Sequence, residues 1–393
     1  MPGGAVTLQT DISQFYPSIY THAVDWAIRG KAAAKKARRS ASLGAQLDAR
    51  LRQSRSGQTV GLSIGPETSW LVAELILARV DEAMCKQYPC MADRAYRVVD
   101  DLTFYAQSVG EAQEVLSFYQ RALAEYELIL NPTKVSILDG LRPPEPDWVS
   151  RLRQARYRDS KEDYLIHDMV DLFAWAFEAS RESPTDGVLS YAIKRCNPFP
   201  AGPRSWPIYR DLVLATITQE PSTLRHVYQI LVFARAHAFE VDNDRLVEVL
   251  NQLCEEHARL DHGYEVSWIL TTLRELNLPL DSRAAQAVAK MNDNCCLILL
   301  MDMCQTARRL RHVDMDAAVR RAEAKGALST SDWLLAYEFR AAKWCPPKKW
   351  DDILQWRELN KAAVRFLVSK PATGRRLRIT RKRPAFLASW GYA

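Results

Sequence analysis

The stretch Tyr96-Arg-Val-Val-Asp-Asp-Leu-Thr-Phe-Tyr105 decides the fold expected for the first part of the chain. Two runs of β-favouring residues, 96–99 and 102–105, meet at Asp100-Asp101. This pattern predicts a β-hairpin with the two acids at its tip. Adjacent acids are common in turns, so the pair by itself says little about function. The segments on either side decide which sheet the hairpin joins.

Three upstream segments supply a strand and helices. Residues 6–12 form an apolar run that predicts a buried strand. Residues 20–51 are mostly helix-favouring in composition. Residues 67–86 carry apolar side chains at helical spacing on one face, and Pro66 suits the start of that helix.

Downstream of the hairpin, the sequence predicts one more helix and one more strand. Ser108 and Glu111 have the spacing of a capping box, and an apolar helical face follows them. The pair Asn131-Pro132 ends this helix, and residues 135–138 predict a strand. The order strand, helices, hairpin, helix, strand matches the split βαβ arrangement of a ferredoxin-like sheet with helices on one side. We therefore expect an α+β fold.

A proline-rich break divides the chain. We expect a sheet domain at residues 1–138, a linker at 139–150, an α-helical domain at 151–369 and a basic tail at 370–393. Short turns between predicted helices favour a stack of helical hairpins, such as a helical repeat. The candidate helices of this second domain are residues 164–177, 208–218, 223–238, 244–257, 266–276 and 282–290.

The composition excludes several classes of protein. With 393 residues, 48% hydrophobic and 25% charged, the chain is neither a disordered tail, a collagen-like rod nor a disulfide-stapled mini-protein. It has no run of 18 apolar residues and no signal peptide, so we expect a cytoplasmic protein without a membrane partner. The eight cysteines show no paired spacing, which predicts free thiols that are mostly buried.

Basic residues are concentrated in two windows. The net charge is only +6, but Arg29 to Arg55 holds nine basic residues against one acid, and Lys370 to Arg383 holds seven basic residues and no acid. Such windows can neutralise the phosphates of a nucleic acid, a process driven by counterion release. The alternative is that each window is an ordinary solvated helix face or tail.

An acid also ends the first predicted strand. In a split βαβ sheet that strand lies beside the hairpin, so Asp11 and Asp100 are expected to converge although 89 residues separate them. Unpaired carboxylates repel one another, and two divalent cations, Mg²⁺ or in its place Mn²⁺, would compensate them. Two such ions about 3.5 to 4 Å apart can activate a 3′-hydroxyl and stabilise a leaving pyrophosphate. This is the chemistry of nucleotidyl transfer.

Three segments, Leu8–Ile19, Gly61–Ser69 and Val98–Asp101, resemble motifs A, B and C of a reverse transcriptase palm, in the expected order. Asn131-Pro-Thr-Lys134 resembles motif D. More narrowly, the chain resembles bacterial abortive-infection and antiphage-defence reverse transcriptases, which also have a helical second domain. The resemblance implies an RNA-directed DNA polymerase that binds RNA or DNA and deoxynucleoside triphosphates, acts in antiphage defence and carries its active site on a palm.

The resemblance also implies roles for individual residues. Asp11 and Asp100 would ligate the catalytic metals, the Ile12 carbonyl would be a further oxygen ligand, and Asp101 would assist beside them. These residues are the implied metal site.

The implied substrate contacts come from other segments. Tyr16 would lie against the sugar and exclude a 2′-hydroxyl. Gly65 would let the nascent base pair approach the backbone, and Ser69 would help to fix that loop. Lys134 would donate a proton or aid the pyrophosphate electrostatically, with an ordinary surface lysine as the alternative.

Some positions depart from the family pattern. Val98 stands where many relatives have an aromatic residue, and Ile64 stands where retroviral enzymes have a glutamine. Only ten residues precede Asp11, so we expect the fingers subdomain to be missing, either because the sequence is a fragment or because another chain supplies it. A template-independent DNA polymerase and a non-catalytic nucleic-acid-binding protein with an idle palm remain alternative functions.

A zinc site has weaker support. Cys254-Glu-Glu-His257 is followed by His262, but no second ligand pair at finger-like spacing accompanies it. The sequence therefore favours a helix-core cysteine and solvated histidines.

Overall fold

The chain forms two compact units, Met1–Pro144 and Glu145–Ala393, each with its own hydrophobic core. The first combines a sheet with helices and the second is helical, so the expected mixed α and β class is confirmed. A computed structural model describes residues 5–36, 41–140, 145–155, 162–196, 204–239, 241, 243–346 and 354–368.

The first unit contains a four-stranded antiparallel sheet. Its strands are β1 (Val6–Thr10), β2 (Ala95–Val98), β3 (Asp101–Ala106) and β4 (Ser136–Asp139), in the spatial order β2-β3-β1-β4. β1 pairs with both β3 and β4, which explains why nearly all of it is buried. The order of the elements along the chain is the one expected from the sequence.

The hairpin differs in one detail from the prediction. Val98 pairs with Asp101, so the two-residue turn consists of Val99 and Asp100. Asp101 is therefore the first residue of β3 rather than part of the tip. The physical reason is that a two-residue turn best follows the twist of the strands that it joins.

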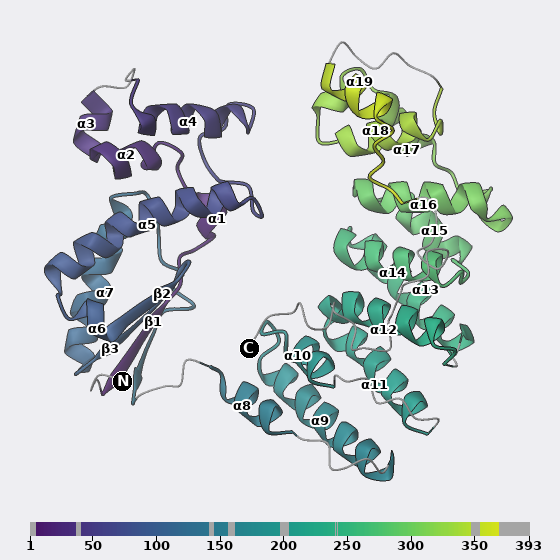
Figure 1. Ribbon diagram of the computed structural model, residues 1–393, viewed down its shortest axis with the longest axis horizontal. Coiled ribbons are helices and arrows are strands. Elements are labelled where there is room, and N and C mark those ends of the chain that lie inside the picture. The colour runs from purple at the N-terminus through teal and green to yellow at the C-terminus, as the bar shows by residue number, and fades with distance from the viewer. Residues whose placement is uncertain are drawn as a thin grey trace. The chain divides into compact units, whose positions relative to one another are not determined.

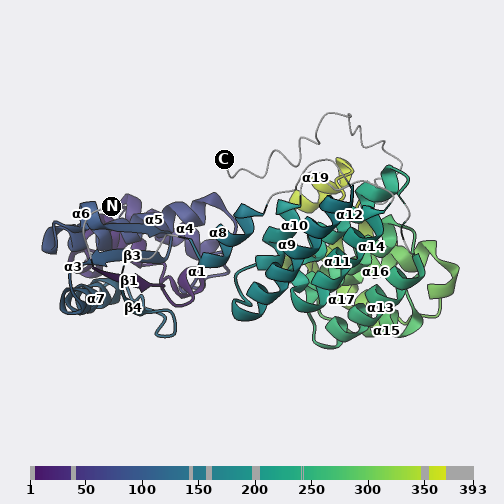
Figure 2. The same cartoon turned by 90° about the horizontal axis from the view of Figure 1, so that it is seen from below.

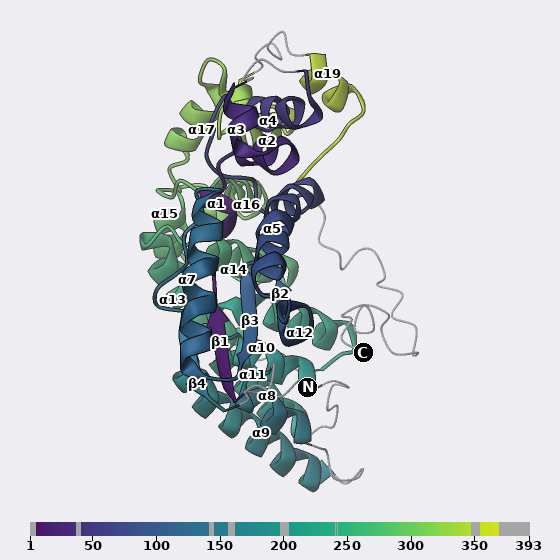
Figure 3. The same ribbon diagram turned by 90° about the vertical axis from the view of Figure 1, so that its left-hand side faces the viewer.

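Two long helices pack against each other beside this sheet. They are α5 (Glu67–Gln87) and α7 (Val109–Ala124), and α7 also contacts β1 and β3 (Figures 1 and 3). The capping box that predicts the start of α7 is present, because the Ser108 hydroxyl accepts a hydrogen bond from the Glu111 N–H at 3.2 Å. The helix then buries Tyr119 completely in the core.

Short helices fill the segment before α5 and the approach to β2. The structure has α1 (Phe15–Ser18), α2 (Ala23–Arg29), α3 (Lys31–Lys36) and α4 (Leu43–Gln53), followed after α5 by α6 (Met91–Arg94). The helical composition of residues 20–51 is therefore confirmed for the part that the structure describes.

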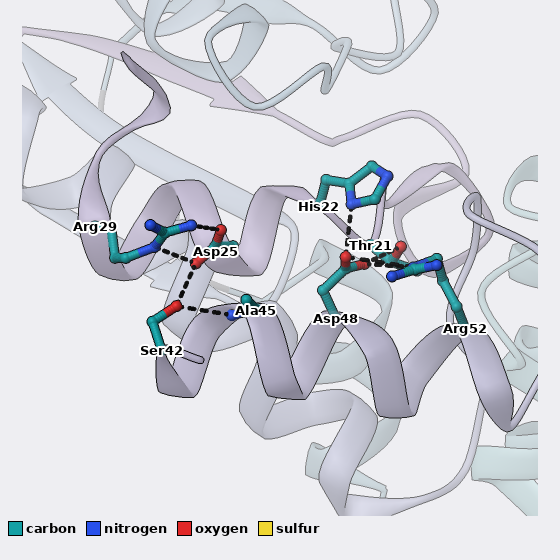
Figure 4. A network of polar contacts seen from close by, with 8 residues as sticks. All are labelled: Thr21, His22, Asp25, Arg29, Ser42, Ala45, Asp48 and Arg52. Atoms are coloured by element: carbon teal, nitrogen blue, oxygen red, sulfur yellow. Dashed lines mark hydrogen bonds and ion pairs between the residues drawn. The ribbon is translucent and has the colours of Figure 1, made fainter. Parts of the chain in front are cut away.

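Buried Asp48 on α4 connects that helix to the start of α2 (Figure 4). Its carboxylate accepts a hydrogen bond from the Thr21 hydroxyl at 2.7 Å and contacts His22 Nδ1 at 2.6 Å. The Arg52 Nε donates to the same carboxylate at 3.2 Å. This network uses one positive charge of the first basic window to neutralise a buried acid.

Asp25 forms a second network, also drawn in Figure 4. Its carboxylate accepts a hydrogen bond from Arg29 Nε at 2.7 Å and contacts the Ser42 hydroxyl at 3.5 Å. Lys31, also in the first basic window, forms a separate ion pair with Glu127 at 3.3 Å. Several positive charges of this window therefore pair with acids of the same chain, while the Lys35 side chain is exposed to solvent.

Ser42 is the N-cap of α4, since its hydroxyl accepts a hydrogen bond from the Ala45 N–H at 3.2 Å. We expect Ser42→Ala to lower the free energy of unfolding by about 1 kcal/mol, because an orphan N–H of the first turn loses its acceptor. Chemical denaturation measures this loss. Ser54→Ala is the matched control, since that hydroxyl only donates to the Leu51 carbonyl near the end of the helix. Equal losses in both variants would contradict the capping role.

The second unit consists of helices that contact partners one or two places further along the chain (Figures 1 and 2). This contact pattern is typical of stacked helical hairpins. A hydrophobic core runs through it from Leu152 to Cys345. Its helices are α8 (Asp147–Gln154), α9 (Glu162–Glu182), α10 (Val188–Arg195), α11 (Ser205–Gln219), α12 (Leu224–Ala236), α13 (Asn243–Arg259), α14 (Gly263–Glu275), α15 (Ser282–Val288), α16 (Asn294–Thr306), α17 (Asp316–Glu323), α18 (Trp333–Ala341) and α19 (Leu354–Lys361), with 3₁₀ turns at Pro221–Thr223, Arg308–Leu310 and Ala327–Ser329.

The predicted linker at 139–150 needs correction at both ends. Asp139 still belongs to β4, and α8 begins at Asp147, where Pro146 allows a helix to start. The predicted basic tail at 370–393 lies outside the described residues. No helix in the described part of the chain is long and apolar enough to cross a membrane.

All eight cysteines are free thiols, as predicted. The expectation that most are buried holds for half of them, because Cys85 and Cys295 are exposed and two others are half-buried. Cys85 lies on α5, Cys295 and Cys304 lie near the two ends of α16, and Cys90 lies in the turn before α6. The buried thiols are Cys196, Cys254, Cys296 and Cys345.

Candidate active site

Two strands deliver the predicted carboxylates to one place. The last paired residues of β1 and β3 are Thr10 and Leu102. Asp11 therefore leaves β1 beside the position where Asp101 begins β3. Asp11 itself is buried, with 7% of its surface exposed. The antiparallel register thus brings together acids that are far apart in sequence.

Two of the three carboxylates bind protons more tightly than exposed acids do. Burial raises the pKa of Asp100 above its ordinary value, and the negative charge of Asp11 adds to that rise. Burial also raises the pKa of Asp101, with further contributions from the charges of Asp100 and Asp11. Desolvation and like charges both favour the neutral acid. The site therefore carries an unfavourable concentration of negative charge.

A lysine from a distant turn meets this charge. Lys134 Nζ donates a hydrogen bond to Asp11 Oδ2 at 2.6 Å, and this contact raises the pKa of the ammonium group. An Asx-type turn holds the segment, because the Asn131 side-chain oxygen accepts from the Thr133 N–H at 3.2 Å. The Lys134 side chain nevertheless remains 61% exposed. It can therefore leave Asp11 when another cation binds.

The backbone after Asp11 is fixed on one side. The Asn131 N–H donates to the Asp11 carbonyl and the Ser13 N–H donates to the Ile129 carbonyl, both at 2.8 Å. The Ile12 side chain is buried in the core. Its carbonyl accepts no hydrogen bond from any described residue, so this oxygen remains available as a ligand.

Tyr16 lies close enough to the carboxylates to respond to them. It belongs to α1 and is half-buried, and its pKa is raised by burial and by the charge of Asp100. The loop predicted to work with it packs directly alongside. The Leu62 N–H donates to the Tyr16 carbonyl at 2.8 Å, and the Gly61 N–H donates to the Ile19 carbonyl at 2.7 Å. Segments about 45 residues apart in sequence thus form one surface.

The glycines of this loop have different roles. Gly61 has φ +90°, and a Cβ there would lie 3.0 Å from the Pro17 carbonyl, so close packing requires glycine. Gly65 has φ +112°, and a Cβ there would meet no described atom within 4 Å. The space above Gly65 therefore admits close approach by a ligand. Ser69 is buried in the first turn of α5, where its N–H donates to the Pro66 carbonyl at 3.0 Å.

Arg97 is a positioning residue that the sequence analysis did not single out. It donates to Glu74 at 2.9 Å and Asp81 at 2.7 Å on α5, and to the Val99 carbonyl at 2.7 Å. Val99 has φ +55°, an uncommon conformation for a β-branched residue. Arg97 therefore holds a strained turn that carries Asp100. The signal for this role in the sequence was the seven-residue spacing of Glu74 and Asp81, which places both acids on one face of α5.

The donor set of this site suits a hard divalent cation. Carboxylates and a backbone carbonyl are the oxygen ligands that Mg²⁺ prefers. The charge repulsion described above would be relieved by such an ion, and Lys134 supplies a positive charge to Asp11 in its place. The described residues therefore fit Mg²⁺ or Mn²⁺.

The raised pKa values predict how cation binding depends on pH. Protons compete with the metal for Asp100 and Asp101 until both carboxyl groups are ionised. Because their pKa values are raised, this ionisation requires a higher pH than that of ordinary carboxyl groups, whose pKa is about 3.9. We therefore expect Mg²⁺ affinity to decline, as the pH falls, at a higher pH than for an exposed carboxylate pair. Calorimetric titrations between pH 4.5 and 8 measure this. An affinity that is constant across that range would contradict the prediction.

No protein-family model matches the chain, and no curated protein matches its sequence.

Proposed function

We propose that this chain is a reverse transcriptase-like nucleotidyltransferase with a ferredoxin-like palm, which adds deoxynucleotides to a 3′-hydroxyl. The observation that carries the proposal is the convergence of Asp11, Asp100 and Asp101, where burial and neighbouring negative charge raise the pKa values of the two hairpin acids. The sheet order with β1 and β3 at its centre supports it.

The three acids and the Ile12 carbonyl would hold two Mg²⁺ ions. When bound, these ions would activate the attacking hydroxyl and stabilise the leaving pyrophosphate. The Asp11 carboxylate is paired with the Lys134 ammonium group. It would therefore release Lys134 when it binds a metal ion. Arg97 would keep the turn of Asp100 in place from the side of α5.

The surroundings of the acids support a nucleotide as substrate. Burial and the negative charge of Asp100 raise the pKa of Tyr16, which indicates that the tyrosine lies near the carboxylates. Its ring would therefore border a sugar bound there and disfavour a 2′-hydroxyl. Exposed apolar side chains on the flanking segments could contact bases, since Ile64 is 75% and Trp70 is 44% exposed. Gly65 would allow the nascent base pair to approach its backbone.

The partners in this proposal are RNA or DNA and deoxynucleoside triphosphates. The non-catalytic alternative has less support, because Arg29 and Arg52 of the first basic window pair with the buried acids Asp25 and Asp48. A role in antiphage defence rests on the resemblance to defence reverse transcriptases.

The test is incorporation of labelled deoxynucleotides by the purified chain. Reactions contain Mg²⁺, Mn²⁺ or a chelator, with an RNA template and primer or with neither, and both free and protein-attached products are counted. Templated synthesis supports a reverse transcriptase, and product without template supports a template-independent polymerase. Metal-dependent nucleotide binding without incorporation in any of these reactions would contradict the proposed enzyme.

Variants of Lys134 separate its two proposed roles. We expect Lys134→Ala to lower the incorporation rate about a hundredfold, because a positioned acid and a positive charge are both lost. Lys134→Arg keeps the charge but donates a proton far less readily. Single-turnover rates at pH 7 therefore distinguish proton donation, for which both variants are slow, from charge stabilisation, for which arginine restores the rate. A rate unchanged in both would identify an ordinary surface lysine.

A further inference from the structure

The turn between α13 and α14 places two histidines side by side. The His262 N–H donates to the His257 carbonyl at 3.0 Å, and the Asp261 N–H donates to the Ala258 carbonyl at 3.2 Å. With Asp261 at φ +56°, these bonds form a Schellman motif. That motif normally brings two apolar side chains together at the positions that His257 and His262 occupy here. The local backbone therefore forces two imidazoles into contact.

The third member of the cluster comes from the next helix. His262 is the residue before α14, and Glu265 is the third residue of that helix. A glutamate at this position characteristically reaches back toward the N-cap. Donor atoms of His257, His262 and Glu265 all lie within 4.8 Å of one another. Two independent rules of helix termination thus assemble the cluster.

The imidazole geometry matches that of two ligands on one ion. His257 Nδ1 and His262 Nδ1 are 3.0 Å apart. Bonds of 2.0 to 2.1 Å to one tetrahedral Zn²⁺ would separate two nitrogens by about 3.3 Å. Imidazole nitrogen suits zinc and neighbouring transition metals, whereas Mg²⁺ prefers oxygen.

We propose that His257, His262 and Glu265 form a Zn²⁺ site that links the end of α13 to the start of α14. Three protein ligands leave a fourth position for water or another ligand, and the half-exposed cluster admits it. This site is chemically distinct from the carboxylate site and does not depend on the proposed polymerase activity.

Two features of the surrounding structure fit this assignment. Cys254 lies one turn before His257 but is completely buried, and burial raises the pKa of its thiol to about 12, so it is no ligand. The two histidines, which the sequence predicts only as solvated side chains, contact each other through their Nδ1 atoms at 3.0 Å. The turn is anchored independently of a metal, because Asp261 Oδ1 accepts from the Asn292 N–H at 2.9 Å. A preformed site therefore needs little reorganisation to bind.

Equilibrium dialysis of the untagged, chelator-treated full chain against Zn²⁺ tests the proposal. Millimolar Mg²⁺ is present, and Asp11 and Asp100 are both replaced by asparagine so that the carboxylate site does not bind Zn²⁺. We expect one Zn²⁺ per chain, with affinity weakened at least about tenfold by His262→Ala and by Glu265→Gln. His237→Ala is the matched control, since His237 is exposed and its Nδ1 contacts its own helix at 2.9 Å.

Circular dichroism verifies that each variant is folded. Failure of the parent chain to bind Zn²⁺, or binding unaffected by both His262→Ala and Glu265→Gln, would overturn the site.

Discussion

Asp100→Asn is expected to lower Mg²⁺-dependent nucleotide incorporation about a thousandfold or more, while the folded protein becomes more stable. The loss of activity follows because a carboxylate that would hold a catalytic cation is replaced by a neutral amide. Removing one group that stabilises transition-state charge costs several kcal/mol, and about 4 kcal/mol corresponds to a thousandfold in rate. Single-turnover incorporation measures the effect.

The gain in stability follows from the pKa of Asp100. Burial and the charge of Asp11 raise this pKa in the folded state. The folded protein then binds more protons than the unfolded chain above about pH 4, so ionised Asp100 lowers stability as the pH rises through its folded pKa. Asparagine carries no such charge. Thermal unfolding should therefore favour Asp100→Asn at pH 7 and show no difference from wild type below pH 4.

Asp93→Asn is the matched control, since Asp93 is an exposed acid on α6 of the same unit. It should change neither activity nor the unfolding temperature appreciably. Full activity of Asp100→Asn, or a loss of stability at pH 7, would show that the carboxylates are structural acids instead of a metal site. The opposite signs of the two expected changes are typical of a functional site that costs stability.

The second large effect is expected in the helical unit. Glu338 on α18 is completely buried, and its Oε2 accepts hydrogen bonds from Arg365 at 2.7 and 2.9 Å. Its Oε1 accepts from the N–H groups of Phe366 and Leu367 at 2.5 and 3.2 Å. Every contact joins α18 to the segment after α19. One carboxylate therefore holds this segment in place.

We expect Glu338→Ala to lower the free energy of unfolding of the helical unit by about 3 to 5 kcal/mol. The variant leaves half-buried Arg365 and two N–H groups without their acceptor, and losing several hydrogen bonds to one buried carboxylate carries a cost of this size. Chemical denaturation with a helix signal measures the change. Proteolysis after residue 363 should accelerate in parallel, because the Phe366 ring loses its support beside Tyr337.

Two further substitutions separate the buried ion pair from a general loss of charge. Glu338→Gln keeps the acceptor oxygen and should lose less stability than alanine. Glu358→Ala removes an exposed glutamate, 57% accessible, whose pair with Lys361 contributes at most about 1 kcal/mol. If Glu338→Ala were no more destabilising than Glu358→Ala, the segment would not depend on Glu338.

Local patterns in the sequence predicted those helices and strands whose buried side chains recur at one regular spacing. The two β-favouring runs around Asp100, the apolar face of α5 and the Ser108 capping box all occur where the pattern indicates. The helix α16 had no candidate, because it is apolar around most of its circumference and lacks the one-sided period of an amphipathic helix. Where burial is one-sided over a long segment, the sequence alone determined the element, whereas the eight-residue helices α10 and α17 had no candidate.

The candidate site divides in the same way. The sequence predicted that Asp11 and the hairpin acids converge, because strand order follows from the sequence of elements. Only the tertiary structure decided that Lys134 pairs with Asp11, that Arg97 holds the Val99 turn, and that two histidines meet at the α13–α14 turn. Those contacts depend on the register of strands and on backbone turns that bring chain segments within hydrogen-bond distance. Periodicity fixes which face a side chain occupies, whereas its partner is fixed by the packing of elements that are distant in sequence.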